Sequence, residues 1–289
     1  MLKKVLAGAV AAIFVTGSSA VFATAQDEVD KQVAKLLGDA ISKRVAATVL
    51  QQQAGSGASL SEPNNIYGSY SRLRSDFSAA GFTTSSRTNI YVGGYDRSLS
   101  DKLILGAAIN GGDTGSSSNA GIAIAGSDFS GIQPYVSYLF TNSFFVIANA
   151  NYSRFSTTGA SGTSSGGGIT LNGVQRFDNF ILKGRVGVSG TRSDFTTAGL
   201  TTKTSSTGYS GDLEGGYYFM PTLYGFVGVQ VTGSNQPNSE ASYARIGLEQ
   251  ALGTSAAVSV TYEGQAGNNL PSGTSAKSNT WTLAARIRF

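Results

Sequence analysis

The sequence contains no cysteine and no histidine in 289 residues. Without cysteine, no disulfide can hold the fold together. Without histidine, the Ser-His-Asp triad and other histidine-assisted hydrolytic mechanisms are excluded. The usual ligands of a structural zinc site are missing as well. We therefore expect a protein that is not an enzyme, with no catalytic residues, no cofactor-binding residues and no metal site.

One string does match a catalytic motif literally. Residues Gly162–Gly166 read G-x-S-x-G, the pattern of a nucleophile elbow, in which a serine sits on a sharp turn from a strand to a helix. Here the string lies in a stretch of Gly, Ser and Thr with no helix after it and no base available. No glycine motif for phosphate or dinucleotide binding follows a strand and opens a helix either. We interpret Gly162–Gly166 as part of a solvated loop.

Long apolar runs are also missing, apart from one near the N-terminus. Lys3 and Lys4 precede the apolar run Val5–Val15, and small residues follow up to Ala23–Ala25. A charged start, an apolar centre and an A-x-A site are typical of a secretory signal peptide. The alternative is a retained anchor helix, but the run is shorter than the ~20 residues that span a bilayer. We expect residues 1–25 to be removed, with cleavage before Gln26.

Charge is sparse, with 13% Asp, Glu, Lys and Arg. Removal of the segment that contains Lys3 and Lys4 lowers the formal net charge from +4 to +2. A charge this small does not support a nucleic-acid partner. The abundance of Gly, with 38 residues, is compatible with disorder, a solenoid or a barrel, so the periodicity of apolar residues has to decide.

Residues 26–65 differ from the rest of the chain. Apolar residues between Asp27 and Gln53 recur at steps of three and four, which places them on one face of a helix. Acidic residues lie near its start and Lys43 and Arg44 nearer its end, as the helix dipole favours. The stretch Ala54–Asn65 is rich in Gly and Ser, so the sequence predicts an amphipathic helix followed by a linker.

From Ile66 onward the apolar period changes to two. Four internal segments alternate apolar and polar residues: Phe180–Ser189, Tyr209–Phe219, Tyr243–Glu249 and Ala256–Gln265. The clearest case is the last segment, whose apolar face consists of Trp281, Leu283, Ala285, Ile287 and Phe289. A strand between lipid and a wet lumen needs this pattern.

Connections of two lengths separate these strands. Five short turns alternate with six longer loops, which predicts twelve strands, with ten as the alternative. The predicted loops are Ser78–Ser86, Gly111–Asn119, Thr157–Gly166, Asp194–Thr202, Ser234–Asn238 and Gly267–Lys277. Short periplasmic turns and longer external loops are typical of outer-membrane barrels. Pro134 lies within a predicted strand, where we expect a β-bulge, because proline cannot donate to the ladder.

Aromatic residues gather near the short turns and predict a girdle at the membrane interface: Tyr138, Phe140, Phe144, Phe145, Tyr217, Tyr218, Phe219, Tyr224 and Phe289. The alternative is the core of a soluble β-sandwich, which leaves the export signal unexplained. The sequence therefore predicts an all-β fold, a transmembrane antiparallel barrel of about 12 strands over residues 66–289. One N-terminal amphipathic α-helix precedes this barrel, which we place in the lipid of a bacterial outer membrane.

Charged residues on the polar faces of the strands are candidates for lining the pore: Arg72, Arg74, Lys183, Arg185, Asp212, Glu214, Arg245, Glu249, Glu263, Arg286 and Arg288. Lys183 and Arg185 lie on the strand next to that of Asp212 and Glu214. Cross-strand salt bridges are favoured there over a selectivity filter.

The sequence resembles the translocator β-domain of autotransporters over Asp27–Phe289. The residues that carry the resemblance are Ile41–Val45 before the barrel, Tyr91–Asp96 followed by Leu103–Ile109, and the terminal Ala284–Phe289. The resemblance implies a twelve-stranded barrel with the helix inside the pore. It also implies that the terminal strand is read by the barrel-assembly machinery.

The chain departs from this family in two respects. No passenger lies between the predicted signal peptide and the helix, so a passenger could be encoded separately. The paired Asn64 and Asn65 follow the predicted helix, whereas self-cleaving members carry such a pair within it, so this activity is not carried over. A helix in the periplasm, a small-solute porin and a structural or adhesive barrel are the alternatives to a plugged translocator.

Overall fold

The computed structural model describes residues 35–36, 38–40, 42–44, 63–79, 82–118, 123–197, 199–235, 238–253, 255–269 and 274–289. The predicted signal peptide and most of the predicted helix and linker lie outside these residues. The strands are β1 (Asn64–Ala79), β2 (Phe82–Ser98), β3 (Leu103–Ser118), β4 (Ala123–Leu139), β5 (Phe144–Thr157), β6 (Ala160–Phe177), β7 (Phe180–Thr197), β8 (Leu200–Met220), β9 (Leu223–Asn235), β10 (Asn238–Leu252), β11 (Ala256–Asn269) and β12 (Thr274–Arg288).

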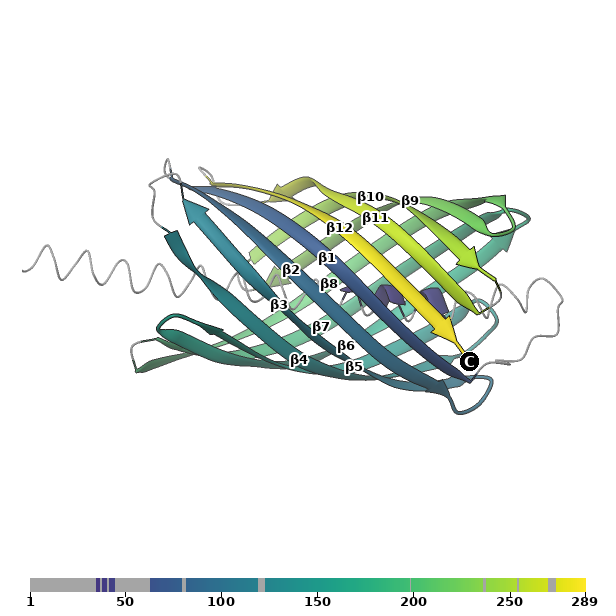
Figure 1. The fold of residues 1–289 in the computed structure, drawn as a ribbon, viewed down its shortest axis with the longest axis horizontal. Coiled ribbons are helices and arrows are strands. Elements are labelled where there is room, and N and C mark those ends of the chain that lie inside the picture. The colour runs from purple at the N-terminus through teal and green to yellow at the C-terminus, as the bar shows by residue number, and fades with distance from the viewer. Residues whose placement is uncertain are drawn as a thin grey trace, which may run out of the picture.

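These strands form one closed barrel in which every strand pairs with its sequence neighbours and β1 pairs with β12 (Figure 1). All pairings are antiparallel, and the closing pair aligns Ile66 with Ile287. Next to it, Asn64 and Phe289 exchange two backbone hydrogen bonds of 3.1 Å. The predicted fold and the count of twelve strands are confirmed. We call the end of the barrel at Asn64 and Phe289 the short-turn end, and the opposite end the loop end.

The outer wall of the barrel is apolar. On β12, the side chains of Trp281, Leu283, Ala285, Ile287 and Phe289 all face outward and are exposed, as predicted. Large apolar side chains continue around the wall, including Leu105, Ile109, Ile132, Ile169, Leu171, Val186, Val188, Leu213, Val227, Val229, Ile246 and Leu248. A soluble protein would bury such a surface, whereas a bilayer covers it.

The aromatic girdle at the short-turn end is present, but three of its predicted members face the lumen. Exposed rings there include Tyr138, Phe140, Phe144, Phe177, Phe180, Tyr217, Phe219 and Phe289. Phe145 and Tyr224 are buried inside, and Tyr218 packs against the same interior cluster. Adjacent residues of a strand point to opposite faces, so runs of two or three aromatics necessarily divide between lipid and lumen.

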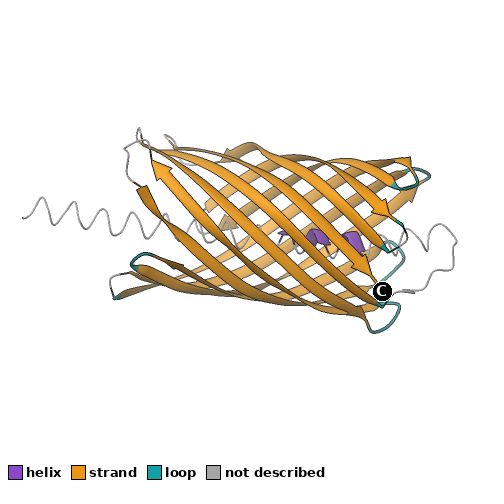
Figure 2. Ribbon diagram, viewed as in Figure 1, coloured by secondary structure: helices purple, strands orange, loops and turns teal. Residues whose placement is uncertain are grey.

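The predicted long loops are wrong, because the strands continue through them. β5 ends at Thr157 and β6 begins at Ala160, so the string Gly162–Gly166 lies within a strand. Gly159 has a φ of +82° in that turn, a conformation that glycine adopts without strain. Strands of 13 to 21 residues exceed the ~9–11 residues that cross a bilayer. Long strands make up nearly the whole wall of the barrel (Figure 2). The part of the wall beyond the apolar band is a ladder rich in Gly, Ser and Thr.

The expected bulge at Pro134 is also wrong. Pro134 pairs with Ala107 of β3. Toward β5 the ladder has no pairs at Gln133 and Pro134, and it resumes at Tyr135 in the same register as before. Because proline lacks an N–H group, the ladder opens locally without an inserted residue.

Inside the barrel, aromatic rings lie over glycines of the next strand. Tyr67 of β1 is 6% exposed and covers Gly94 of β2, where a β-carbon would overlap its ring. We expect Gly94→Ala to lower the free energy of unfolding by about 1–3 kcal/mol, because the ring must move in a filled interior. Gly93→Ala is the matched control, since no atom lies within 4 Å of its β-carbon position. Urea unfolding of both variants in detergent measures the difference; equal effects would contradict this packing.

A short helix lies in the lumen, nearer the short-turn end (Figure 1). Its described residues are 35, 36, 38–40 and 42–44, within the predicted range Asp27–Gln53, and we call it the lumen helix. Leu36 is 8% exposed and belongs to the interior cluster, against which Ala40 packs. No helix among the described residues is long and apolar enough to cross a membrane.

Candidate functional site

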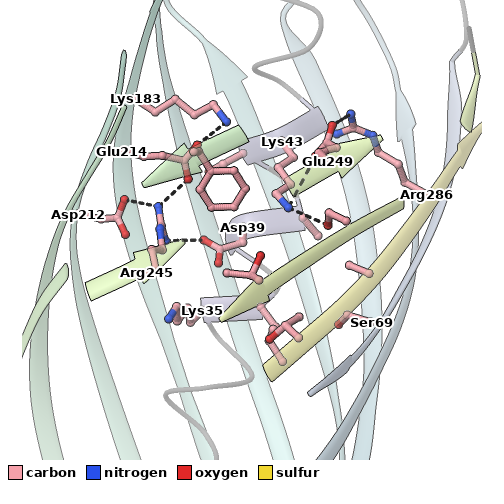
Figure 3. Close-up of a pocket in the computed structure, with 18 of the residues that line it drawn as sticks. Lys35, Asp39, Lys43, Ser69, Lys183, Asp212, Glu214, Arg245, Glu249 and Arg286 are labelled. Atoms are coloured by element: carbon pink, nitrogen blue, oxygen red, sulfur yellow. Dashed lines mark hydrogen bonds and ion pairs between the residues drawn. The ribbon is translucent and has the colours of Figure 1, made fainter. Parts of the chain in front are cut away.

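The lumen wall beside the helix carries a cluster of opposite charges (Figure 3). Glu214 of β8 is its centre, since its carboxylate accepts hydrogen bonds from Lys183 at 2.7 Å and Arg245 at 2.9 Å. The hydroxyl of Tyr224 donates a third, at 3.2 Å. Arg245 also contacts Asp212, at 2.7 Å. Glu214 is 4% exposed, and burial of a carboxylate is tolerated only with partners of this kind.

The lumen helix inserts its own charges into this wall. Asp39 lies 2.9 Å from Arg185 of β7 and 4.0 Å from Arg245 of β10. One turn later, Lys43 lies 3.7 Å from Glu249, which also binds Arg286 at 2.6 Å. One turn before Asp39, Lys35 pairs with Glu263 of β11.

Hydrogen bonds from the helix to uncharged side chains of the wall add to these ion pairs. The hydroxyl of Ser42 donates to Asn172 of β6 at 2.9 Å, and Lys43 donates to Ser259 of β11 at 3.0 Å. Strands from separate parts of the wall thus hold one face of the helix.

A second attachment lies at the short-turn end. Arg44 is 1% exposed and pairs with Asp96 of β2, which is fully buried. Its guanidinium group also donates to the hydroxyl of Ser98 at 2.8 Å and to the carbonyl of Pro63 at 3.1 Å. Asp96 further accepts hydrogen bonds from Asn65 at 2.9 Å and from Tyr135 at 2.8 Å. This site joins Arg44, the last described residue of the lumen helix, to the first strands of the barrel.

Solved structures with this architecture are known. The translocator domain of the autotransporter NalP from Neisseria meningitidis superposes with a TM-score of 0.59 at 11% identity, over 89% of this chain and 98% of that chain. The β-domain of the Bordetella autotransporter BrkA gives 0.59 at 14% identity, over 79% and 100%. The transport unit of AIDA-I from Escherichia coli gives 0.56 at 12% identity, over 84% and 97%. No family model and no curated protein matches the sequence.

The chain has the fold of an autotransporter translocator domain. An outer-membrane channel from Pseudomonas putida F1 shares the architecture at a TM-score of 0.53 and 12% identity, over 79% of this chain and 96% of that chain. A closed antiparallel barrel with an apolar outer wall and an aromatic girdle is an outer-membrane architecture. The translocator-fold barrel therefore belongs in a bacterial outer membrane.

Most of the charged residues predicted to line the pore do meet in the lumen of the translocator-fold barrel. Lys183 faces Glu214, and Arg185 faces Asp212, across the β7–β8 ladder. Arg245, Glu249, Glu263, Arg286 and Arg288 lie on inward positions of β10, β11 and β12.

The prediction for Arg72 and Arg74 is wrong. They pair with Trp281 and Asn279 of β12, and paired residues point to the same side, so both arginines face outward. Charged residues are confined to the lumen face only along the part of a strand within the hydrocarbon. Near the loop end the outer face also admits charge, so the charge of Arg72 and Arg74 does not determine which way they point.

Sequence reasoning missed the charged face of the lumen helix as a site. Lys35, Asp39 and Lys43 recur every four residues, which places alternating charges on one helical face. This spacing indicates a charged helical face, but it does not indicate which residues of the barrel wall that face contacts. Asp96 is a second residue that the sequence does not mark as lumen-facing. It stands out only as part of the stretch Tyr91–Asp96 that resembles translocators.

The lumen beyond the helix, toward the loop end, has a different lining. A cavity there is bordered mainly by uncharged polar residues and glycines, among them Asn110, Gln133, Asn149, Asn151, Ser153, Thr170, Ser206, Gln230 and Thr232. Among the described residues, no group of three or more potential metal ligands is present. The lumen thus has a charged zone around the helix and a neutral polar zone outside it.

Proposed function

We propose that this protein is a translocator-type outer-membrane barrel whose pore is closed by its own lumen helix. The observation that carries the proposal is the contact of Asp39 with both Arg185 and Arg245. A wall built only as a channel would match its charges to one another. Here Arg185 lies 2.9 Å from the helix carboxylate and 3.7 Å from Asp212 of its own wall, so the helix supplies its nearer partner.

The remaining charges of the helix support the same conclusion. Lys35, Lys43 and Arg44 each meet a carboxylate of the barrel. Opposite charges in a partly dry lumen attract more strongly than in water. Several strands hold the helix at once, so we propose that it plugs the pore stably rather than entering it transiently.

The orientation of the helix supports the translocator type. Lys35 and Gly38 border the neutral cavity toward the loop end, whereas Arg44 is bound at the short-turn end. The polar extension of Gly, Ser and Thr lies at the loop end, and the larger polar part of an outer-membrane barrel faces the cell exterior. We therefore infer that the N-terminal end of the helix is directed toward the exterior. The uncharged lining on that side offers few strong contacts to a polypeptide within the lumen.

A conductance measurement tests the plug. In planar bilayers, we expect the protein lacking residues 1–25 to conduct little, and a further deletion of residues 26–62 to open a pore. The deletion stops before β1, so the barrel wall is unchanged. Equal conductance of both proteins would contradict the plug. An open channel in both would support the second candidate, a small-solute porin, which the neutral cavity and the Pseudomonas channel favour.

We also propose that residues 1–25 are a removed signal peptide and that the barrel-assembly machinery reads the outward face of β12. That face is intact and exposed along its whole length, from Trp281 to Phe289. It lies at the seam where the barrel closes, which is the part of the wall that must stay accessible until closure.

A further inference from the structure

Three arginines lie together on the lipid side of the barrel wall. Arg74 of β1 and Arg87 of β2 are direct partners across the ladder, and Arg72 lies on the same face of β1. Arg74 and Arg87 are exposed and Arg72 is half-buried. All three lie nearer the loop end than the outer-wall rings of Tyr70 and Tyr91, whose centres are 5.2 Å apart. We call these three residues the arginine patch.

The carboxylates next to the arginine patch are engaged elsewhere. Asp76 accepts a hydrogen bond from Ser85 at 2.6 Å and is paired in register with Lys277. Asp113 accepts one from the amide of Asn89 at 3.0 Å. Within the described ranges, no ion pair connects any arginine of the patch to a carboxylate, and the Nε of Arg72 is buried without a partner.

Two other cations on the outer wall near the loop end share one carboxylate. Arg192 and Lys203 lie 3.9 and 4.0 Å from Asp194. Arg154 donates to the hydroxyl of Tyr152 at 3.1 Å. In the arginine patch, by contrast, two arginines are direct partners across the ladder, so the patch is a local concentration of positive charge.

Two like charges directly opposite each other destabilise a pair of strands. This repulsion disappears when an anion bridges the side chains. The guanidinium fork matches phosphate geometry and binds it through two parallel hydrogen bonds. On a lipid-facing wall near its outer boundary, the anions at hand are the phosphates of lipid headgroups.

We propose that Arg72, Arg74 and Arg87 form a binding site for a lipid of the outer leaflet that carries more than one phosphate group. The site lies outside the barrel and is separate from the lumen helix, so it does not depend on the proposed plug, and its place in the outer leaflet rests on the orientation of the barrel given under the proposed function. Its occupant would hold the β1–β2 pair, next to the closing seam, against the membrane boundary.

Native mass spectrometry of the detergent-solubilised barrel, titrated with diphosphorylated lipid A, tests the proposal. We expect Arg74→Gln combined with Arg87→Gln to weaken binding at least about tenfold, since two charge-assisted contacts are lost. Arg192→Gln is the matched control, because it removes an outer-wall cation that is already paired, and binding should be unchanged. Heat-modifiable gel mobility checks that each variant is folded.

The unfolding midpoint of Arg74→Gln, measured with and without lipid A, gives an independent test. In lipid-free detergent, Arg74→Gln should leave the unfolding midpoint unchanged or raise it, because a like-charge pair is relieved. With lipid A present, the same variant should have a lower midpoint than the unchanged protein. If the double Gln variant does not fold, Arg74→Lys with Arg87→Lys, which keeps the charge but not the fork, should bind with intermediate strength.

Four results would overturn the proposal. The first is equal binding by the double variant and the unchanged protein, and the second is an equal loss in Arg192→Gln. The third is displacement of lipid A by millimolar inorganic phosphate, which would identify a site for free phosphate. Binding of phosphatidylcholine with the same affinity would count against it as well, because that lipid carries one phosphate and no net charge.

Discussion

Replacement of Glu214 by alanine is expected to lower the free energy of unfolding by about 3–5 kcal/mol, the usual cost of removing one partner from a buried ion pair. Glu214 is the shared partner of Lys183 and Arg245, at 2.7 and 2.9 Å. Without it, Lys183 loses its ion pair, and the hydroxyl of Tyr224 loses its acceptor. Arg245 keeps its ion pairs with Asp212 and Asp39. The lost interactions are therefore mainly those of Lys183 and Tyr224.

Urea unfolding in detergent measures this loss. The protein has a single tryptophan, Trp281 on the outer wall of β12, so its fluorescence reports on the folded barrel in every variant. Asp194→Ala is the control, since its pairs on the outer wall are long, at 3.9 and 4.0 Å, and its side chain is 40% exposed. Exposed pairs contribute about 0–1 kcal/mol. A loss for Glu214→Ala within that range would show that the cluster contributes little to the fold.

The fold was predictable where the membrane constrains the sequence. Inside the apolar band, each strand has one face toward lipid and one toward the lumen, so a period of two is enforced. Trp281 to Phe289 show it without exception, and Lys183, Arg185, Asp212 and Glu214 were assigned to the correct face for the same reason.

Beyond the apolar band this constraint disappears. There the predicted loops and side-chain directions are wrong. The stretch Thr157–Gly166 was assigned to a loop because it is polar and rich in glycine. In water, however, a hydrogen-bonded ladder needs no apolar face. The predicted inward direction of Arg72 and Arg74 is wrong for a related reason, since near the membrane boundary a charged side chain can face outward.

The lumen site was predictable in its parts but not in its pairs. The four-residue spacing of Lys35, Asp39 and Lys43 marks a charged helical face. Which wall residues it meets depends on the depth and rotation of the helix within a closed barrel. No local pattern in the sequence encodes that placement, and the contact of Asp39 with Arg185 joins residues far apart in the chain.

Asp39→Arg is expected to displace the lumen helix and raise the bilayer conductance to that of the protein without residues 26–62. The new cation would lie beside Arg185 and Arg245, where the carboxylate now lies at 2.9 and 4.0 Å. At 4 Å, two unit charges near a protein surface interact by ~4 kcal/mol, so attraction becomes repulsion. Asp39→Asn removes the attraction without adding repulsion, so its conductance should be intermediate.

Exchange of the two charges separates this mechanism from a general disturbance of the helix. Arg185→Asp combined with Asp39→Arg restores an opposite pair at the same place, although Arg245 still faces the new cation. We expect the combined variant to conduct less than Asp39→Arg alone, which is the non-additivity that a direct contact produces in a double-mutant cycle. If Asp39→Arg stays closed, Asp39 does not hold the plug. If the exchange leaves the pore as open as the single variant, Arg185 is not its partner, and the helix closes the lumen by its shape rather than by its charge.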